Sequence, residues 1–360
     1  MRQLRKVILR ILCVTLLLVS GLAATATSAQ AAVPDRWGFA YVNAYSGIPS
    51  PAHQAGSWSV GFNVSVTPGA VGQSFVRFPQ IATTGGVVHV TAVAQDAYWC
   101  QAQNWGPSGP DLVVAVQCYR YGGAPVFAQY TVVFETSTGT LPVAQGFGYV
   151  HYNGAFIAGQ FNSVSAPNSV TGGGGSWTVS LPGLGSPAAA GNIQVTAVNP
   201  TQPARCKVAG WTPTASGQMI QVRCFNATNV PLNTGWTLTY QRERAITGAA
   251  IPPKNFAYTF DLSSAPGPYA PTPVGINHNS QLGVNTVQSS GVGLRMVLFP
   301  QVAAAPTHVQ ATAFGPGPEF CNLQTLWTLS GTTVFVRNVA CYSAGTRVSH
   351  RSMTTYTSAF

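Results

Sequence analysis

Charged side chains are scarce in this chain of 360 residues. Asp, Glu, Lys and Arg together make up 7% of the sequence, and only seven of them are acidic. So few charges cannot cover the solvent-facing side of long helices, whereas the abundant Gly, Pro, Val and aromatic residues suit short strands joined by tight turns. Apolar residues still account for 46% of the chain, so the scarcity of charge does not indicate disorder.

Beyond the N-terminal segment a basic cluster is also missing. The Lys and Arg residues there are scattered, and those that lie close together form short pairs, such as Arg242 with Arg244 and Arg347 with Arg351. A nucleic-acid-binding surface normally carries a basic stripe, so we expect no nucleic-acid partner. The positive net charge is consistent with weak attraction to an anionic cell-wall polymer, and equally with simple solubility.

Long apolar runs are confined to the N-terminus, so no later membrane span is expected. The N-terminal segment has basic residues between positions 2 and 10, an apolar run to about residue 24, and an A-x-A cleavage signal at Ala29 and Ala31. This order is typical of a secretory signal peptide, with a membrane anchor as the alternative. We therefore expect residues 1–31 to be removed and the remaining protein to be extracellular, with association to the cell wall as an option.

One sequence unit occurs three times in the remaining chain, and we assign the repeats to residues 37–136, 147–244 and 256–358. The first shared motif is FAYV at 39–42, FGYV at 147–150 and FAYT at 256–259. The second, G-x-x-x-V-x-[FL]-P, begins at Gly72, Gly175 and Gly293. The third is HVTAV at 89–93, QVTAV at 194–198 and QATAF at 310–314. A unit of about 100 residues is long enough to be a domain with its own core.

Each repeat is expected to be a β-domain. The first copy contains about seven strand-like runs, near 38–44, 57–66, 74–79, 87–94, 98–104, 112–119 and 126–135. Short alternating runs separated by Gly and Pro turns, without helical periodicity, are typical of an antiparallel sandwich or small barrel. The fold class predicted is all-β, with three tandem antiparallel β-sandwich or small β-barrel domains.

The cysteines occur in pairs, one pair in each repeat: Cys100 and Cys118, Cys206 and Cys224, Cys321 and Cys341. The midpoint of each pair falls in a turn-like stretch, so the two cysteines face each other across a hairpin. Opposed residues in an antiparallel pair have Cα atoms about 4.5–5.5 Å apart, which suits a disulfide. A zinc site would need closely spaced ligands, and no histidine recurs near the pairs, so we expect three disulfides and no metal.

A tryptophan follows the first cysteine of each pair by five or six residues: Trp105, Trp211 and Trp327. Two interpretations stay open. The ring can be a core residue packed near the disulfide, as in immunoglobulin-type sandwiches. Alternatively, it can be an exposed platform near the hairpin tip that stacks on a sugar ring, since tryptophan suits such amphipathic contacts.

Catalytic signatures are lacking as well. The sequence contains no H-E-x-x-H, G-x-S-x-G, Walker or Rossmann pattern, and none of the acidic residues or the six histidines recurs in all three copies. Asp96 and Asp111 are the one carboxylate pair that could meet across the first hairpin, as a glycosidase would require. We expect no enzyme and no cofactor.

The repeat resembles a secreted, disulfide-stapled β-repeat module of unknown function from high-GC Gram-positive bacteria. The stretches that carry the resemblance are SWTVSLPGL, GNIQVTAV, RCKVAGW and IQVRCF in the second copy. The chain departs from the pattern where its Tyr is replaced by Phe75 or Met296, and where Arg347 replaces a late Pro. The resemblance implies an extracellular β-domain and no activity.

The function expected from these observations is non-catalytic binding of a glycan or cell-envelope polymer, with avidity from repetition. The alternative is a structural or protein-contact component without a glycan ligand, such as an envelope protein or a protease inhibitor. The oligomeric state is not predicted.

Overall fold

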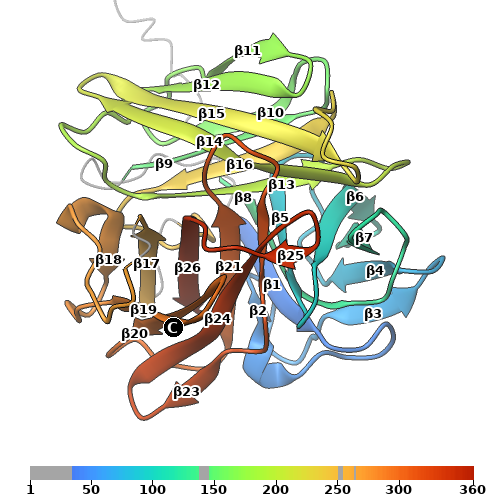
Figure 1. The fold of residues 1–360 in the computed structure, drawn as a ribbon. Helices are drawn as coiled ribbons and strands as arrows, with labels where there is room; N and C mark the ends of the chain where they lie inside the picture. Colours follow the sequence, from blue (N-terminus) through green and yellow to red (C-terminus); the bar gives the residue numbers. More distant parts are fainter. Residues whose placement is uncertain (1–34, 138–145, 250–253, 263–264) are drawn as a thin grey trace, which may run out of the picture. The chain divides into compact units, whose positions relative to one another are not determined.

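The computed structural model describes residues 35–137, 146–249, 254–262 and 265–360, which belong to one unit, Pro34–Phe360 (Figure 1). The predicted signal peptide, residues 1–31, lies outside the described residues. Within them the chain forms 26 strands and two short 3-10 helices, and no α-helix. The expectation of an all-β fold is therefore confirmed. No helix in the described part of the chain has the length and apolarity needed to span a bilayer.

The elements of the first repeat are β1 (Arg36–Val42), η1 (Pro51–His53), β2 (Gln54–Gly56), β3 (Ser65–Pro68), β4 (Gln73–Phe78), β5 (Val87–Val93), β6 (Tyr98–Ser108), β7 (Asp111–Arg120) and β8 (Gln129–Thr136). Those of the second are β9 (Phe147–Tyr152), β10 (Ile157–Asn162), β11 (Ser169–Gly173), β12 (Ser176–Pro182), β13 (Asn192–Val198), β14 (Ala204–Thr214), β15 (Gly217–Asn226) and β16 (Gly235–Gln241). Those of the third are β17 (Phe256–Asp261), η2 (Val274–Ile276), β18 (Asn277–Asn279), β19 (Thr286–Gly291), β20 (Leu294–Phe299), β21 (Thr307–Ala313), β22 (Phe320–Leu323), β23 (Thr328–Ser330), β24 (Thr333–Ser343), β25 (Thr346–Arg347) and β26 (Ser352–Ser358).

Each repeat is built from two antiparallel sheets around an apolar core. One sheet has the order β2-β1-β8-β5, β10-β9-β16-β13 or β18-β17-β26-β21. The other has the order β3-β4-β7-β6, β11-β12-β15-β14 or β19-β20-β24, with β22 and β23 both paired to β24. Alternation along the strands places Val88, Val90 and Ala92 in the core of the first repeat, while His89 and Thr91 point the other way.

Two details of the sequence interpretation are corrected by the strand register. The run 57–66 is not a single strand, because residues 57–64 connect β2 to β3. The FAYV motif is also displaced by two residues. Phe39 pairs with Val133 of β8. At the position equivalent to Val133, strand β16 pairs with Tyr149 and strand β26 with Tyr258, each two residues after the phenylalanine of its motif. A two-residue slip keeps each side chain on the same face of a strand, so a sequence pattern cannot detect it.

The glycine of the second motif is explained by its backbone. Gly72, Gly175 and Gly293 all have positive φ, at 74°, 90° and 69°. A Cβ atom at any of them would lie within 2.8 Å of a neighbouring atom. The carbonyl of each accepts a hydrogen bond from the backbone N–H of the second cysteine of its repeat. This close approach of the turn to the disulfide hairpin requires glycine.

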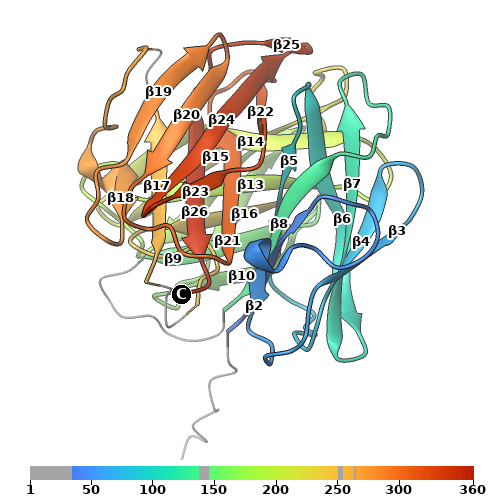
Figure 2. The same ribbon diagram turned by 90° about the horizontal axis from the view of Figure 1, so that it is seen from below.

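The three repeats pair with one another in a cycle. Parallel bridges join Val93 to Leu323, Val198 to Ala102, and Phe314 to Val208. Each bridge connects the end of the third motif in one repeat to the residue two positions after the first cysteine of another. Figure 2 shows the first repeat (blue to teal) beside the third (orange to red). The repeats are therefore arranged with approximate threefold symmetry around a shared axis.

Polar side chains fill the space around this axis. Thr91 donates to the carbonyl of Ala311 at 3.2 Å, Thr312 donates to that of Val195 at 3.2 Å, and the N–H of Val90 donates to Thr196 at 3.1 Å. The three threonines occupy equivalent positions, as do the three backbone partners. These bonds satisfy buried polar groups between the repeats, so this layer of contacts around the axis is polar, whereas each repeat's own core is apolar.

Candidate binding site in the first repeat

Three equivalent positions near one end of each sandwich hold a different set of side chains in every repeat. They are Val42, Ser74 and Tyr130 in the first repeat, Tyr152, Trp177 and Trp236 in the second, and Asp261, Arg295 and Ser352 in the third. Strand register establishes the first and last positions, because Val42 pairs with Tyr130, Tyr152 with Trp236, and Asp261 with Ser352. The middle position lies two residues after the positive-φ glycine of each copy, which is Gly72, Gly175 or Gly293.

The second and third repeats close this space in opposite ways. In the second, the ring centroids of Tyr152 and Trp236 lie 5.3 Å apart, and Trp177 lies 6.0 Å from Trp236. In the third, Arg295 Nε donates to Asp261 Oδ2 at 2.7 Å, and both side chains are buried. A stack of large rings and a buried ion pair therefore occupy the same place in two of the copies.

The first repeat leaves a groove of about 200 Å³ there. Its floor includes Ser74 and Tyr130, whose hydroxyl oxygens are 2.6 Å apart, and its wall includes Val42. Burial raises the pKa of Tyr130, so the phenol stays protonated and able to donate a hydrogen bond. The groove exists because Ser74 and Val42 are much smaller than Trp177 and Tyr152.

Aromatic and amide side chains line the rim of the groove. Tyr45 is 50% exposed, and its ring centroid lies 3.8 Å from that of Phe127. Asn43 and Gln129 are exposed lining residues, and Gln129 Oε1 accepts a hydrogen bond from the hydroxyl of Tyr41 at 2.5 Å. Amides carry both donors and acceptors, so the rim combines an apolar ring face with groups that suit hydroxyls.

The repeated tryptophans lie elsewhere. Trp327 is only 2% exposed, and its Nε1 donates to Thr307 Oγ1 at 2.9 Å. Trp105 and Trp211 are half-buried and donate to the carbonyl of Gly85 and the amide oxygen of Gln218, respectively. None of the three is an exposed ring at a hairpin tip.

Each of these tryptophans instead contacts the first strand of another repeat. Trp105 packs against His151, with ring centroids 4.5 Å apart. Trp211 packs against Phe260 at 6.3 Å, and Trp327 against Tyr41 at 6.0 Å. By strand register Tyr41, His151 and Phe260 are equivalent positions. The repeated tryptophan is therefore an inter-repeat contact that follows the threefold arrangement.

The six cysteines form the three disulfides expected from their spacing. Cys100–Cys118, Cys206–Cys224 and Cys321–Cys341 each join directly opposed residues of a hairpin, with Cα atoms 4.0, 4.1 and 4.0 Å apart. Disulfide sulfur atoms are not thiolate metal ligands. Among the described residues, no group of three or more His, Cys, Asp or Glu side chains is arranged to hold a metal ion.

The proposed carboxylate pair does not assemble. Asp96 precedes β6 at one end of the first hairpin, whereas Asp111 pairs with Ser108 at its other end. At about 3.3 Å per residue the 11 residues of β6 place them roughly 35 Å apart. Asp111 instead forms an ion pair with Arg77 at 3.0 Å. The idea that these two residues flank one bond is therefore wrong.

Sequence reasoning missed the groove residues because Tyr45 and Phe127 have no aromatic counterpart in the other copies. One signal was present, since the aligned second motif places Ser74 opposite Trp177 and Arg295.

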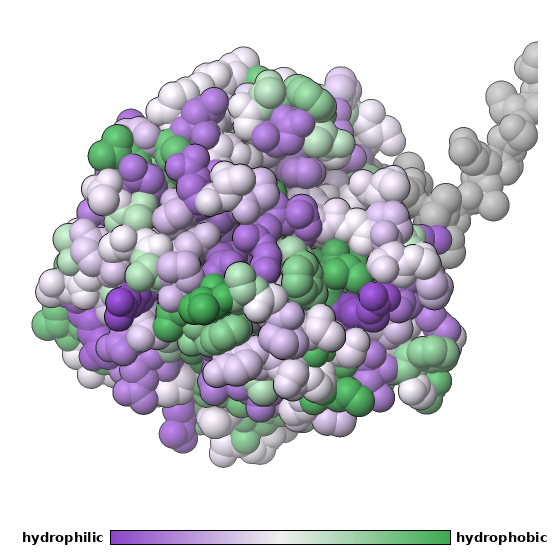
Figure 3. Space-filling view, turned by 90° about the vertical axis from the view of Figure 1, so that its right-hand side faces the viewer, coloured by the Kyte–Doolittle hydropathy of each residue, from purple (hydrophilic) through white to green (hydrophobic). Residues whose placement is uncertain are grey.

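Figure 3 shows one face of the molecule, where hydrophobic residues appear as separate small patches among hydrophilic ones. The chain matches no protein-family model, no curated protein and no solved structure in the comparisons made with each.

Proposed function

We propose that the mature protein is a secreted, non-catalytic binding protein that holds a glycan of the cell envelope in the groove of the first repeat. The observation that carries the proposal is the groove itself, which lies where the other two copies are filled. Its volume of about 200 Å³ exceeds the roughly 150 Å³ that accommodates a six-membered ring such as benzene.

The chemistry of the lining favours a sugar over a purely apolar ligand. Tyr45 and Phe127 supply an apolar face, while Asn43, Gln129 and the hydroxyls of Ser74 and Tyr130 supply polar contacts. Small-molecule sites commonly combine aromatic walls with a few positioned polar groups. Among the described residues no charged side chain lines the groove, which disfavours a strongly ionic ligand.

The non-catalytic part of the proposal rests on where the carboxylates lie. Asp111, Asp261 and Glu319 are paired with basic residues, and Glu135 is buried between repeats. None of these four lines the groove. The secreted location rests on the N-terminal segment and on the three disulfides, which form in oxidising compartments.

The test is retention of the purified mature protein on insoluble polysaccharides and on peptidoglycan. Tyr45→Ala removes the exposed ring of the groove, and Phe156→Ala removes an exposed ring of the second repeat, 63% exposed, as the matched control. We expect the parent and Phe156→Ala to be retained on the same matrix and Tyr45→Ala to be released at least tenfold more readily. Equal retention of the two variants would contradict the groove, and no retention of the parent would favour the structural, protein-contact alternative.

A further inference from the structure

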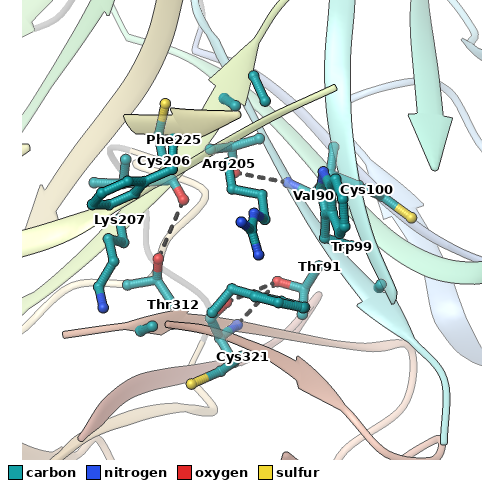
Figure 4. Close-up of a pocket in the computed structure, with 18 of the residues that line it drawn as sticks. Val90, Thr91, Trp99, Cys100, Arg205, Cys206, Lys207, Phe225, Thr312 and Cys321 are labelled. Carbon is teal, nitrogen blue, oxygen red and sulfur yellow. Dashed lines mark hydrogen bonds between the residues drawn. The ribbon is translucent and has the colours of Figure 1, made fainter. Parts of the chain in front are cut away.

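A second cavity, of about 50 Å³, lies where the three repeats meet (Figure 4). Its lining contains equivalent residues from all three copies. Thr91, Thr196 and Thr312 form one layer, and Ala92, Ala197 and Ala313 form the next. The residues before the first cysteines, Trp99, Arg205 and Phe320, also line it, as do the charged residues Lys207 and Glu319. The cavity therefore belongs to the assembled repeats and not to any one of them.

Arg205 breaks the symmetry of this last layer. Its guanidinium carbon lies 4.8 Å from the ring centroid of Trp99 and 4.6 Å from that of Phe320, so two aromatic faces hold it. Figure 4 shows the side chain pointing into the cavity beside Trp99. Arg205 is only 6% exposed.

The hydrogen bonds of Arg205 are incomplete. Nη2 donates to the carbonyl of Asn226 at 3.0 Å and to Asn229 Oδ1 at 2.6 Å. Its Nε and Nη1 are buried and have no hydrogen-bond partner among the described residues. Burial lowers the pKa of Arg205 to about 10, so the side chain remains charged at neutral pH. Two unpartnered donors on a buried cation are energetically costly unless an acceptor binds to them.

The neighbouring charged groups do not neutralise Arg205. Lys207 Nζ lies 3.2 Å from Glu319 Oε2 and 3.1 Å from His350 Nε2. Burial lowers the pKa of His350 to about 4, so the imidazole is neutral at physiological pH. The carboxylate of Glu319 therefore neutralises the ammonium group of Lys207. The positive charge of Arg205 is not neutralised by these neighbours. Glu319 is 22% exposed and lies toward solvent, whereas Lys207 is buried.

We infer that this axial cavity is a binding site for one small inorganic anion of about the size of chloride, held by Nε and Nη1 of Arg205. A cavity of this volume is large enough for such an ion with one or two waters, because a single water needs about 10–15 Å³. It is too small for a sugar acid. Since all three repeats line the cavity, the bound anion stabilises their assembly.

The first experiment compares thermal unfolding of the mature protein in sodium chloride and in sodium gluconate at equal ionic strength. Because ligand binding to the folded state raises stability by mass action, we expect Tm to rise by about 2 °C for each tenfold increase in chloride above Kd. Arg205→Met should lose this dependence, and Arg120→Gln, which removes an exposed arginine, should keep it. Equal Tm in the two salts, or a chloride effect retained in Arg205→Met, would overturn the inference.

A second measurement does not depend on a variant that folds. Crystals of the unaltered protein soaked in sodium bromide should show an anomalous scattering peak within about 3.5 Å of Nε and Nη1 of Arg205. Density without anomalous signal at that point would identify water as the partner of Arg205 and would overturn the anion site. Neither measurement involves the groove of the first repeat, so either proposal can fail alone.

Discussion

Ser74 of the first repeat occupies the position that Trp177 occupies in the second. Both lie two residues after the glycine that packs on the disulfide hairpin, and both pair with a valine two residues before the second cysteine. The difference in side-chain volume between them separates a sandwich with a groove from one whose end is closed by three aromatic rings. Substitutions at a few positions of a repeated unit, here Ser74 together with Val42, can therefore create a site without altering the fold.

Ser74→Trp is expected to fill the groove of the first repeat. The ring would occupy the space above Tyr130 and displace any ligand, so retention on the polysaccharide that binds the parent should fall at least tenfold. The substitution also removes the hydrogen bond between Ser74 and Tyr130, and overpacking costs about 1–3 kcal/mol. Denaturant unfolding should therefore show a modest loss of stability with all three disulfides intact. Undiminished retention in a folded variant would show that the ligand lies elsewhere.

Trp327→Ala is expected to destabilise the whole assembly by about 3–5 kcal/mol, the usual cost of truncating a buried tryptophan. The ring lies between the third repeat and the first, where it contacts Tyr41 and His53. Urea unfolding of this variant beside Phe156→Ala, which should stay within about 0.5 kcal/mol of the parent, checks the prediction. A small effect at Trp327 would show that the repeats do not depend on this contact.

Arg295→Met should destabilise the third repeat by about 3–5 kcal/mol, because it leaves the carboxylate of Asp261 buried without its cation. The hydroxyl of Tyr269 also donates to Asp261, which favours the lower end of that range. The double variant Asp261→Asn/Arg295→Met removes both charges and should recover part of the loss. If the double variant were less stable than Arg295→Met, the ion pair would not be the source of the effect.

His89 is expected to make stability depend on pH below neutrality. Burial lowers its pKa to about 3 from an ordinary value of 6.5. Between pH 6.5 and 3, His89 binds a proton in the unfolded chain but not in the folded protein. The stability present above pH 6.5 is therefore lost as the pH falls toward 3. The slope from this group alone is about 1.4 kcal/mol per pH unit.

His89→Gln should remove that contribution, and glutamine is the residue found at the equivalent positions 194 and 310. The free energy of unfolding, measured between pH 7 and pH 4, should fall less steeply in the variant than in the parent. Histidines elsewhere in the structure also have lowered pKa values, so a residual slope is expected. Identical slopes would mean that His89 is accessible to water in solution.

Glu135 should have the opposite effect. Burial raises its pKa well above the usual range, although Thr239 donates a hydrogen bond to Oε1 at 2.5 Å. The folded state therefore favours the neutral acid, and stability is lost as the pH rises from 4.5 toward the raised pKa. Glu135→Gln, which places the residue of position 241 at the equivalent site, should raise Tm by a few degrees at pH 7 and leave it unchanged at pH 4. A lower Tm at pH 7 would show that the charged carboxylate has a partner.

Several properties of this protein could be read from the sequence because they are local. Cysteine separations of 18, 18 and 20 place the two cysteines of each pair opposite each other across a hairpin. Hairpin geometry then determines the disulfides. Alternation of apolar residues and regular turn residues predict the all-β class, because the two faces of a strand repeat with period two. The threefold repetition is likewise visible in the amino-acid sequence alone.

Only the tertiary structure decided what the second face of each strand meets. Alternation places His89, Gln194 and Gln310 on the face opposite the core, but a pattern cannot distinguish solvent from another repeat. In the structure all three are buried against another repeat: His89 bonds to Thr239, Gln194 donates to the carbonyl of Met353, and Gln310 donates to the carbonyl of His89. The same ambiguity hid the role of Trp105, Trp211 and Trp327, the groove at Ser74 and the cavity at Arg205. Each depends on contacts between residues that are far apart in the sequence, and no local pattern encodes such a contact.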